Sequence, residues 1–241
     1  MNLYGNLSDE AAMAGMLYGM NPKTIVSIPA SETINFGKAV FLNAEKNALV
    51  GGKYNNKAVI DLSAYTTASK DIVLTIKGVE IEATTSGVIA NDVAAIVEDI
   101  NEIEGVTAVA GTGGDAGKII VTSDDSADLG VKLVYDGSDV TSSKVTASSD
   151  CVYAGVAVFH QNAFINSRGC YVAKEAVNVM EKGYVYGALA SGVNPTVEAS
   201  AYVTAAGLFT TESSGNTLVG KFKSGAKSGP SSDSLALVSI E

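Results

Sequence analysis

The side chains best suited to covalent or acid–base chemistry are one histidine, His160, and two cysteines, Cys151 and Cys170. An imidazole beside a thiol can act as the base that generates a thiolate nucleophile, provided that an acid orients the imidazole. Both cysteines fall on or beside predicted strands, where cysteine is more often a small buried apolar residue. We therefore expect that the Cys–His pair does not catalyse a reaction.

Two loops are the remaining candidates for ligand chemistry. Residues 111–117 have the sequence GTGGDAG, but they lie between two predicted strands and no helix follows, so the geometry that binds phosphate is missing and a hairpin tip is predicted. Asp124, Asp125 and Asp128 place three carboxylates close together, as a Ca²⁺ site requires. The glycine and glutamate of a calcium-binding loop are absent, which favours a solvated acidic loop and leaves cation binding open. We expect no catalytic residue, no cofactor and no metal.

Composition narrows the classes of partner. The chain has 241 residues, 16 of them Lys or Arg and 26 Asp or Glu, for a formal charge of −10. This balance argues against nucleic acid and against an anionic membrane surface, because both recruit clustered Lys and Arg. Two cysteines exclude a disulfide-built scaffold and a four-cysteine zinc site. Residues 1–24 lack the basic start of a signal peptide, and no segment has the roughly 18 apolar residues of a membrane span.

Residues 1–25 are predicted to form an N-terminal arm. Apolar residues from Ala12 to Met20 follow helical spacing, and Pro22 follows them. One interpretation is a helix that packs on the same chain. The other is an extension that docks on a neighbouring subunit, for which the methionines supply an adaptable surface. The residues that we assign to such contact are Leu3, Tyr4, Met13, Met16, Leu17 and Tyr18.

Residues 26–65 and 148–241 share one style of sequence. Both contain short β-branched or aromatic runs separated by glycine, without a helical period. Many short strands at near-regular spacing are typical of a barrel or a sandwich. We therefore predict a mainly-β protein whose parent domain is a discontinuous β-barrel or jelly-roll-like fold made of these two stretches.

Residues 66–147 differ in kind and are predicted to be an inserted α+β module. Alternation from Ile72 to Glu82 predicts a hairpin with one solvated face. A helix is predicted next, with an N-cap signal at Asn91 and Asp92 and its end at Gly105. Its apolar face consists of Val93, Ile96, Val97, Ile100 and Ile103.

Strands complete this module. They are predicted at 106–110 and 118–123, with a further strand at 131–135, which gives a ββαββ order. Stretches rich in Ser, Thr and Asp, at 63–71 and 138–150, are predicted to be linkers that join the module to the parent domain.

Several motifs of the parent domain carry a family resemblance. They are, in order, INFGKAV from Ile34, YAGVA from Tyr153, AVNVMEKGYVYG from Ala176, AYV from Ala201, GLFT from Gly207, LVGKF from Leu218 and LALV from Leu235. Their order resembles the cement or decoration proteins of tailed-bacteriophage capsids. The resemblance covers most of the parent domain, and its motifs contain no catalytic signature.

A second resemblance covers residues 71–123, which are similar to the small β-α-β modules inserted in flagellin and related surface filaments. The shared I-N-x-x-x-G-V-T-A core consists of Ile100, Asn101, Gly105, Val106, Thr107 and Ala108. Such modules decorate the outer faces of assemblies. The resemblance therefore implies that residues 66–147 protrude, an addition to the usual cement protein.

The resemblance to cement proteins implies a structural virion protein, not an enzyme, that binds the outer surface of a phage capsid. It would cement neighbouring major capsid proteins and stabilise the expanded shell, with the arm residues above as contacts. The implied partners are the major capsid protein and further copies of the chain in a dimer or trimer, without nucleic acid or membrane. The implied location is the capsid exterior, and the host cytoplasm during assembly; the inserted module is a candidate for host-surface contact.

Two other classes stay open at this point. One is a secreted bacterial surface or filament module, flagellin- or adhesin-like, although no long heptad-patterned helices stand at the ends of the chain. The other is a Cys-dependent hydrolase, which alkylation of Cys151 and Cys170 would test.

Overall fold

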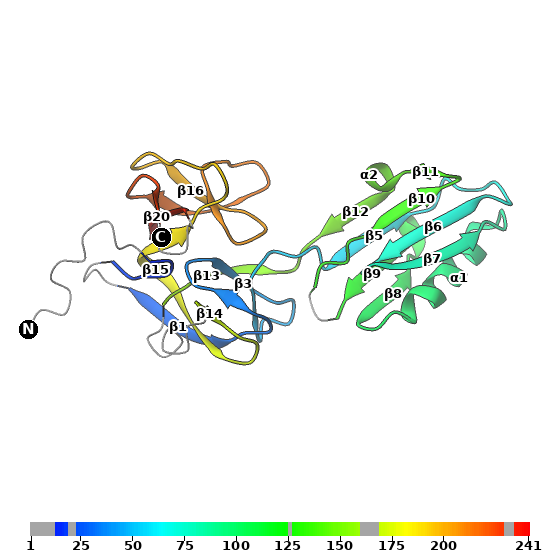
Figure 1. The fold of residues 1–241 in the computed structure, drawn as a ribbon. Coiled ribbons are helices and arrows are strands. Elements are labelled where there is room, and N and C mark those ends of the chain that lie inside the picture. Colours follow the sequence, from blue (N-terminus) through cyan, green and yellow to red (C-terminus); the bar gives the residue numbers. More distant parts are fainter. Residues whose placement is uncertain (1–12, 19–22, 125–126, 160–168, 229–233) are drawn as a thin grey trace, which may run out of the picture. The chain divides into compact units, whose positions relative to one another are not determined.

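The computed structural model describes residues 13–18, 23–124, 127–159, 169–228 and 234–241 (Figure 1). The chain divides into two compact units. We call Met1–Lys53 with Val152–Glu241 the split unit, and Tyr54–Cys151 the continuous unit. Strands dominate both, which confirms the predicted mainly-β class.

The split unit is built around a ten-stranded sheet that curls into a half-barrel. Its main path runs β17-β16-β18-β20-β15-β13-β3-β4, with β1 paired to β15 and β19 paired to β20. A separate two-stranded sheet joins β14 to β2. The strands are β1 (Thr24–Pro29), β2 (Ile34–Asn35), β3 (Ala39–Leu42), β4 (Leu49–Val50), β13 (Val152–Ala157), β14 (Cys170–Tyr171), β15 (Ala176–Ala188), β16 (Ser200–Val203), β17 (Phe209–Thr210), β18 (Thr217–Phe222), β19 (Lys227–Ser228) and β20 (Ser234–Ile240).

Strand β15 is 13 residues long and organises this sheet (Figure 1). Its first half pairs with both β1 and β13, so that Val179 faces Val26 on one edge and Ala157 on the other. Its second half pairs with β20 from Gly183 to Ala188. Strand β15 therefore has hydrogen-bonded partners on both of its edges.

The arm is where the structure departs most from the sequence-based expectation. Residues 13–18 form no helix; they run extended beside the second half of β15, where Leu17 bridges Val185. The helical spacing misled because Met13, Met16 and Leu17 are each half-buried in an irregular segment. Apart from one turn bond, from Met16 N–H to Met13 O at 3.0 Å, the backbone bonds of this segment go to β15 and to Phe159. We call residues 13–18 the strap.

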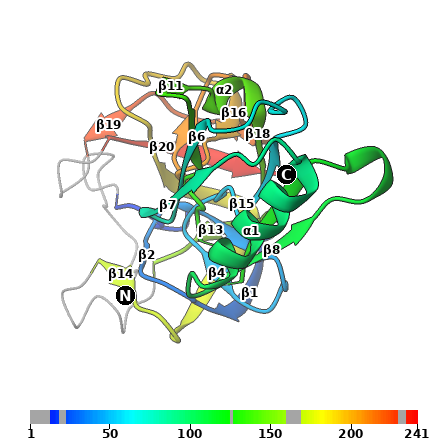
Figure 2. The ribbon, with the colours of Figure 1, turned by 90° about the vertical axis from the view of Figure 1, so that its right-hand side faces the viewer.

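The continuous unit consists of two facing four-stranded sheets, β11-β10-β6-β7 and β12-β5-β9-β8. Helix α1 links the edge strands β7 and β8 and packs against both, and α2 links β11 to β12 (Figures 1 and 2). The elements are β5 (Lys57–Asp61), β6 (Asp71–Ile76), β7 (Val79–Thr84), α1 (Ile89–Asn101), β8 (Val106–Ala110), the 3₁₀ turn η2 (Gly113–Asp115), β9 (Lys118–Ser123), β10 (Lys132–Tyr135), β11 (Ser138–Asp139), α2 (Thr141–Lys144) and β12 (Val145–Ser148).

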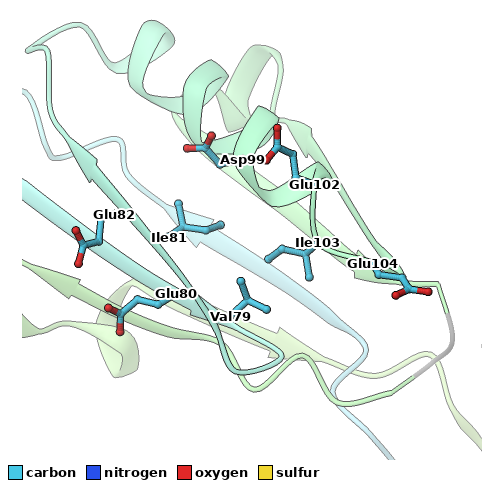
Figure 3. Close-up of a pocket in the computed structure, with 8 residues that line it drawn as sticks. All are labelled: Val79, Glu80, Ile81, Glu82, Asp99, Glu102, Ile103 and Glu104. Atoms are coloured by element: carbon cyan, nitrogen blue, oxygen red, sulfur yellow. The ribbon is translucent and has the colours of Figure 1, made fainter.

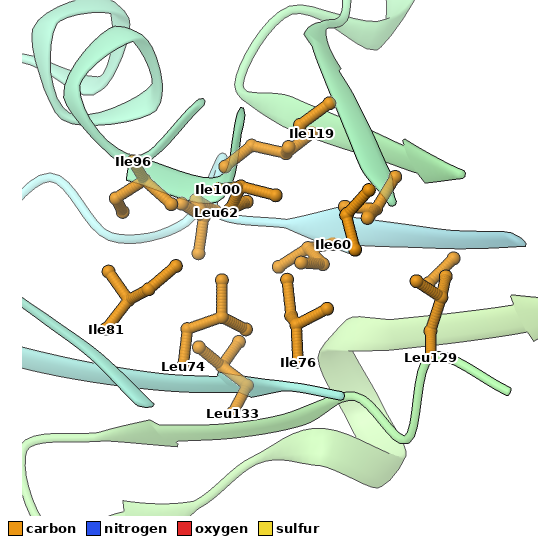
Figure 4. Close-up of a cluster of buried hydrophobic side chains, with 14 of the residues drawn as sticks. Ile60, Leu62, Leu74, Ile76, Ile81, Ile96, Ile100, Ile119, Leu129 and Leu133 are labelled. Carbon is orange, nitrogen blue, oxygen red and sulfur yellow. The ribbon is translucent and has the colours of Figure 1, made fainter. Parts of the chain in front are cut away.

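Figure 4 shows the core of this unit between the two sheets. Leu74 and Ile76 of β6 face Ile60 of β5 and Ile119 of β9, and all four are fully buried. Ile96 and Ile100 of α1 close the open side. The alternating pattern of β6 and the 3.6-residue pattern of α1 therefore bury their apolar faces against one another, as the sequence predicts.

The limits of the continuous unit differ from the predicted module of 66–147. It extends from Tyr54 to Cys151, because β5 pairs with β9 on one side and β12 on the other. The stretch 138–150, predicted to be a linker, holds β11, α2 and β12. These elements lie at the edges of the sheets and bury little apolar surface, so a stretch rich in Ser and Thr shows no hydrophobic period that would predict them.

Helix α1 begins two residues before the predicted cap. Its N-cap is Val88, which makes no side-chain cap bond. Asp92 lies in the first turn and accepts a hydrogen bond from the backbone N–H of Ser86 at 2.8 Å. The Asp92 carboxylate thus accepts a hydrogen bond from a backbone N–H that precedes the helix, although Asp92 itself belongs to the first helical turn. The predicted end at Gly105 is wrong: α1 ends at Asn101 with Glu102 as its C-cap, so Ile103 lies beyond the helix. Gly105, with a φ of 70°, lies in the turn that leads to β8.

The strap is held by a close approach of two glycines. Gly15 and Gly37 both have a φ of 73°, and a Cβ on Gly37 would lie 2.7 Å from the N of Gly15 and 2.9 Å from the O of Tyr186. Replacing Gly37 with alanine should therefore lower the free energy of unfolding by at least about 2 kcal/mol, since backbone strain and overlap add. Urea unfolding followed by tyrosine circular dichroism measures this.

Gly215→Ala is the matched control. Gly215 also has a φ of 73°, but a Cβ added there would meet nothing within 4 Å, so this variant isolates the conformational cost of about 1 kcal/mol. Equal losses in the two variants would show that the contact between Gly15 and Gly37 does not stabilise the strap.

Candidate functional site

The residues singled out for nucleophilic chemistry do not form a described site. His160 lies outside the described residues. Cys151 is buried at 5% exposure, and Cys170 is half-buried in β14, where it pairs with Asn35. Both thiols are free within the structure.

The charged side chains described in the two candidate ligand loops bond to neighbouring protein groups. The glycine-rich stretch is a hairpin tip between β8 and β9, with an ion pair of 2.7 Å from Lys118 to Asp115. Asp124 accepts a hydrogen bond from the Thr107 hydroxyl at 3.0 Å, and Asp128 accepts one from the N–H of Gly130 at 3.1 Å. Asp125 lies outside the described residues. Across the described part of the chain, no group of three or more His, Cys, Asp or Glu could hold a metal ion.

Shifted pKa values have ordinary local causes. Burial raises the pKa of the Tyr153 hydroxyl, whose ring packs edge-on against Phe41. A hydrogen bond from Lys223, at 2.6 Å, lowers the pKa of the exposed Glu198 carboxyl. These groups lie singly or in surface ion pairs, so the shifts mark no acid–base cluster. No described helix is long and apolar enough to cross a membrane.

The strap brings together four of the six residues assigned to partner contact. Met13, Met16 and Leu17 are half-buried, and Tyr18 is 51% exposed. The backbone bonds of the strap to β15 run from Gly15 N–H to Tyr186 O at 2.8 Å and from Tyr186 N–H to Met16 O at 3.0 Å. Leu3 and Tyr4 lie outside the described residues.

Tyr18 belongs to a small aromatic group. Its ring meets Tyr186 edge-to-face at a centroid distance of 6.3 Å, and its backbone N–H donates to the Tyr184 carbonyl at 3.1 Å. Tyr186 is buried, while Tyr18 remains accessible. In the strap, Met16 packs against the cluster of Tyr186, Leu235 and Leu237, while Tyr18 is presented outward.

A groove that the sequence did not reveal lies in the continuous unit, between β7 and α1 (Figure 3). Its volume is about 520 Å³. Three apolar and five carboxylate side chains line it: Val79, Ile81, Ile103, Glu80, Glu82, Asp99, Glu102 and Glu104. We call it the acidic groove. The sequence hid it because the residues come from a strand and from the end of a helix about 20 positions later, which only the fold brings together.

Charge is distributed unequally between the two units. The continuous unit holds 16 of the 26 acidic residues and 6 of the 16 basic residues, a formal charge of −10. The split unit holds the other 10 of each and is formally neutral. All of the net charge is thus carried by residues 54–151.

Asn101, the last residue of α1, completes the edge of the second sheet. Its amide nitrogen donates to the Ala108 carbonyl at 3.1 Å, and its amide oxygen accepts from the Ala108 N–H at 2.7 Å. The Asn101 side chain therefore makes the two hydrogen bonds to Ala108 that the backbone of a neighbouring strand would otherwise make. This pair of bonds gives the physical reason for the Ile100–Asn101 and Val106–Ala108 motif noted in the sequence.

The described residues thus form a mainly-β chain with a strap bonded into its sheet and one strongly acidic unit. The family model described as structural cement protein (E217 gp24/Pam3 gp6) matches residues 99–241. Because the match spans more than half of the chain, the chain belongs to this family of phage cement proteins.

Two other comparisons add little. A solved structure from Mycobacterium phage Patience is similar over 95% of this chain and 96% of its own, at 12% identity and a TM-score of 0.31, a likeness on which no argument rests. A search of curated proteins finds no match.

The family confirms the resemblance to cement proteins. The protein is a structural component of the virion and cements the phage capsid by binding capsid proteins. The secreted-filament alternative receives no support.

Asn101→Ala should destabilise the continuous unit by about 1–3 kcal/mol, because both backbone groups of Ala108 lose their partners. The freed edge of β8 should also promote self-association, visible as concentration-dependent light scattering. Glu98→Ala, an exposed change on the same helix, should stay within about 0.5 kcal/mol of wild type. Equal stability of the two variants would refute the edge-capping role.

Proposed function

We propose that the protein binds the outer surface of the expanded capsid and bridges neighbouring copies of the major capsid protein, without catalysing a reaction. Membership of the cement family carries this proposal. The protein joins the shell from the host cytoplasm during assembly, as a dimer or trimer, because shell symmetry presents identical sites around each axis. It contacts neither nucleic acid nor membrane.

The proposed division of the chain is an arm at 1–25, a cement domain formed by the rest of the split unit, and an inserted domain formed by the continuous unit, in place of the 66–147 predicted from the sequence. The compact units described above support such an interruption, and its limits lie at Tyr54 and Cys151. The inserted domain faces away from the shell in this proposal and is the part available for contact with a host surface.

The N-terminal arm supplies the shell contact, through Leu3, Tyr4 and Tyr18. The support comes from the strap, whose hydrogen bonds to β15 fix the point from which the preceding residues extend. Tyr18, at 51% exposure, is a large aromatic side chain at the other end of the strap. Met13, Met16 and Leu17 belong to the same proposed contact; all three are half-buried, and Met16 also packs against Tyr186, Leu235 and Leu237.

The test is co-sedimentation with expanded empty phage heads. Removing residues 2–12 leaves the strap in place, so the variant should fold with an unchanged unfolding midpoint and bind the heads at least about tenfold more weakly. Removing residues 1–18 would be a poor experiment, since it also uncovers the edge of β15.

Point variants test whether head binding depends on the arm or on any exposed apolar side chain. Tyr18→Ser should weaken head binding, whereas Leu218→Ser, at an exposed apolar residue of β18, should leave it unchanged. Full binding by the 2–12 deletion together with Tyr18→Ser would overturn the assignment of the arm. No binding by the intact protein, in any oligomeric state seen by light scattering, would overturn the proposed function itself.

A further inference from the structure

Strand β7 has one edge without a partner among the described residues. It lies at the end of its sheet and pairs only with β6, from Val79 opposite Ile76 to Thr84 opposite Asp71. Lys77 and Gly78 form the two-residue turn, with φ values of 49° and 78°. In such a hairpin Ile76 and Val79 exchange hydrogen bonds, so the backbone groups of alternate residues point the other way.

These outward groups belong to Glu80 and Glu82. No backbone bond of the described residues reaches their N–H or C=O groups from the outer side. The edge opens into the acidic groove, whose floor is formed by Ile81 and Ile103 together with Val79, 46% exposed (Figure 3). A segment lying there would find backbone partners along one side and apolar contacts beneath it.

The other sheet edge beside α1, that of β8, lacks this opening. On β8, the equivalent side is closed by the Asn101 amide, which bonds both backbone groups of Ala108. At the turn of the β6–β7 hairpin, the Lys77 ammonium donates to the Gly105 carbonyl at 3.2 Å and ties the turn to the loop after α1. The turn before β7 is thus tied to the loop after α1. The backbone edge of β7 that faces the groove has no partner among the described residues.

Charge decides what can occupy that edge. A second copy of β7 would place Glu80 and Glu82 against the same glutamates, and like charges facing each other destabilise a strand pair. Asp99, Glu102 and Glu104 add three carboxylates on the α1 side of the groove. Since the continuous unit carries the whole charge of −10, it repels acidic partners and attracts basic ones.

We propose that the edge of β7 binds an extended basic segment of a partner protein as an added strand of the sheet. In this segment Lys or Arg alternates with apolar residues, because successive side chains of a strand point to opposite faces. Its apolar side chains lie over Ile81 and Ile103, and its cations lie beside Glu80 and Glu82. The inference is independent of the shell contact proposed for the arm.

The test uses the full-length protein and the peptide acetyl-Lys-Val-Lys-Val-Lys-amide. Titration followed by amide NMR should give saturable shifts at Glu80 and Glu82, and hydrogen exchange at these two amides should slow in the complex. The same peptide with Glu in place of Lys should not bind. A Lys-Val peptide N-methylated on the residues that face β7 should also fail, since it keeps the charges but lacks the backbone donors.

Matched charge variants locate the site. Glu80→Gln with Glu82→Gln should weaken binding of the Lys-Val peptide about fivefold or more, and added salt should reduce that difference. Asp71→Asn with Glu98→Gln removes the same charge from exposed positions of the same unit outside the groove, and should weaken binding less than about twofold.

Three outcomes would overturn the proposal. They are no binding of the Lys-Val peptide at millimolar concentration, equal binding of the N-methylated peptide, and equal losses in the two double variants. The last two would show that the acidic unit attracts cations without strand addition. Head binding by the same variants is measured separately, so failure here leaves the cementing role untouched.

Discussion

The split unit depends on the pairing of β15 along both of its edges. A strand of 13 residues would expose many backbone groups if either edge were left open, and each buried group without a partner costs stability. Strand β1 and the strap cover one edge, while β13 and then β20 cover the other. Gly183, with a φ of 131°, lies where the second neighbour changes. Residues far apart in the sequence therefore meet on one strand.

This arrangement suits a protein that must join an assembly without changing its own fold. The strap is part of the sheet, so the terminal segment before it starts from a fixed place on the split unit. For the shell contact proposed for the arm, a fixed point of attachment reduces the conformational freedom lost on binding. The half-barrel sheet provides the packed support to which the strap is bonded.

The continuous unit treats the two sheet edges beside α1 differently. Asn101 closes β8, while β7 carries glutamates and faces the acidic groove. The concentration of the net charge in this unit keeps free copies apart in solution without weakening the neutral split unit. The glutamates of β7 thus also disfavour pairing of its edge with the same edge of a second copy.

The sequence by itself determined the element types where a period was strong. The alternation of β6 and β7 and the apolar face of α1 follow from local geometry, and the motifs around β15 identified the family. The sequence could not determine that residues 13–18 are a strap, because a partly inward extended segment and an amphipathic helix share the same short spacing. Nor could it join β5 and β12 to the continuous unit, or bring Glu80 and Glu102 to one groove. Those outcomes depend on strand pairing between distant segments, and only the tertiary structure decides which backbone edges meet.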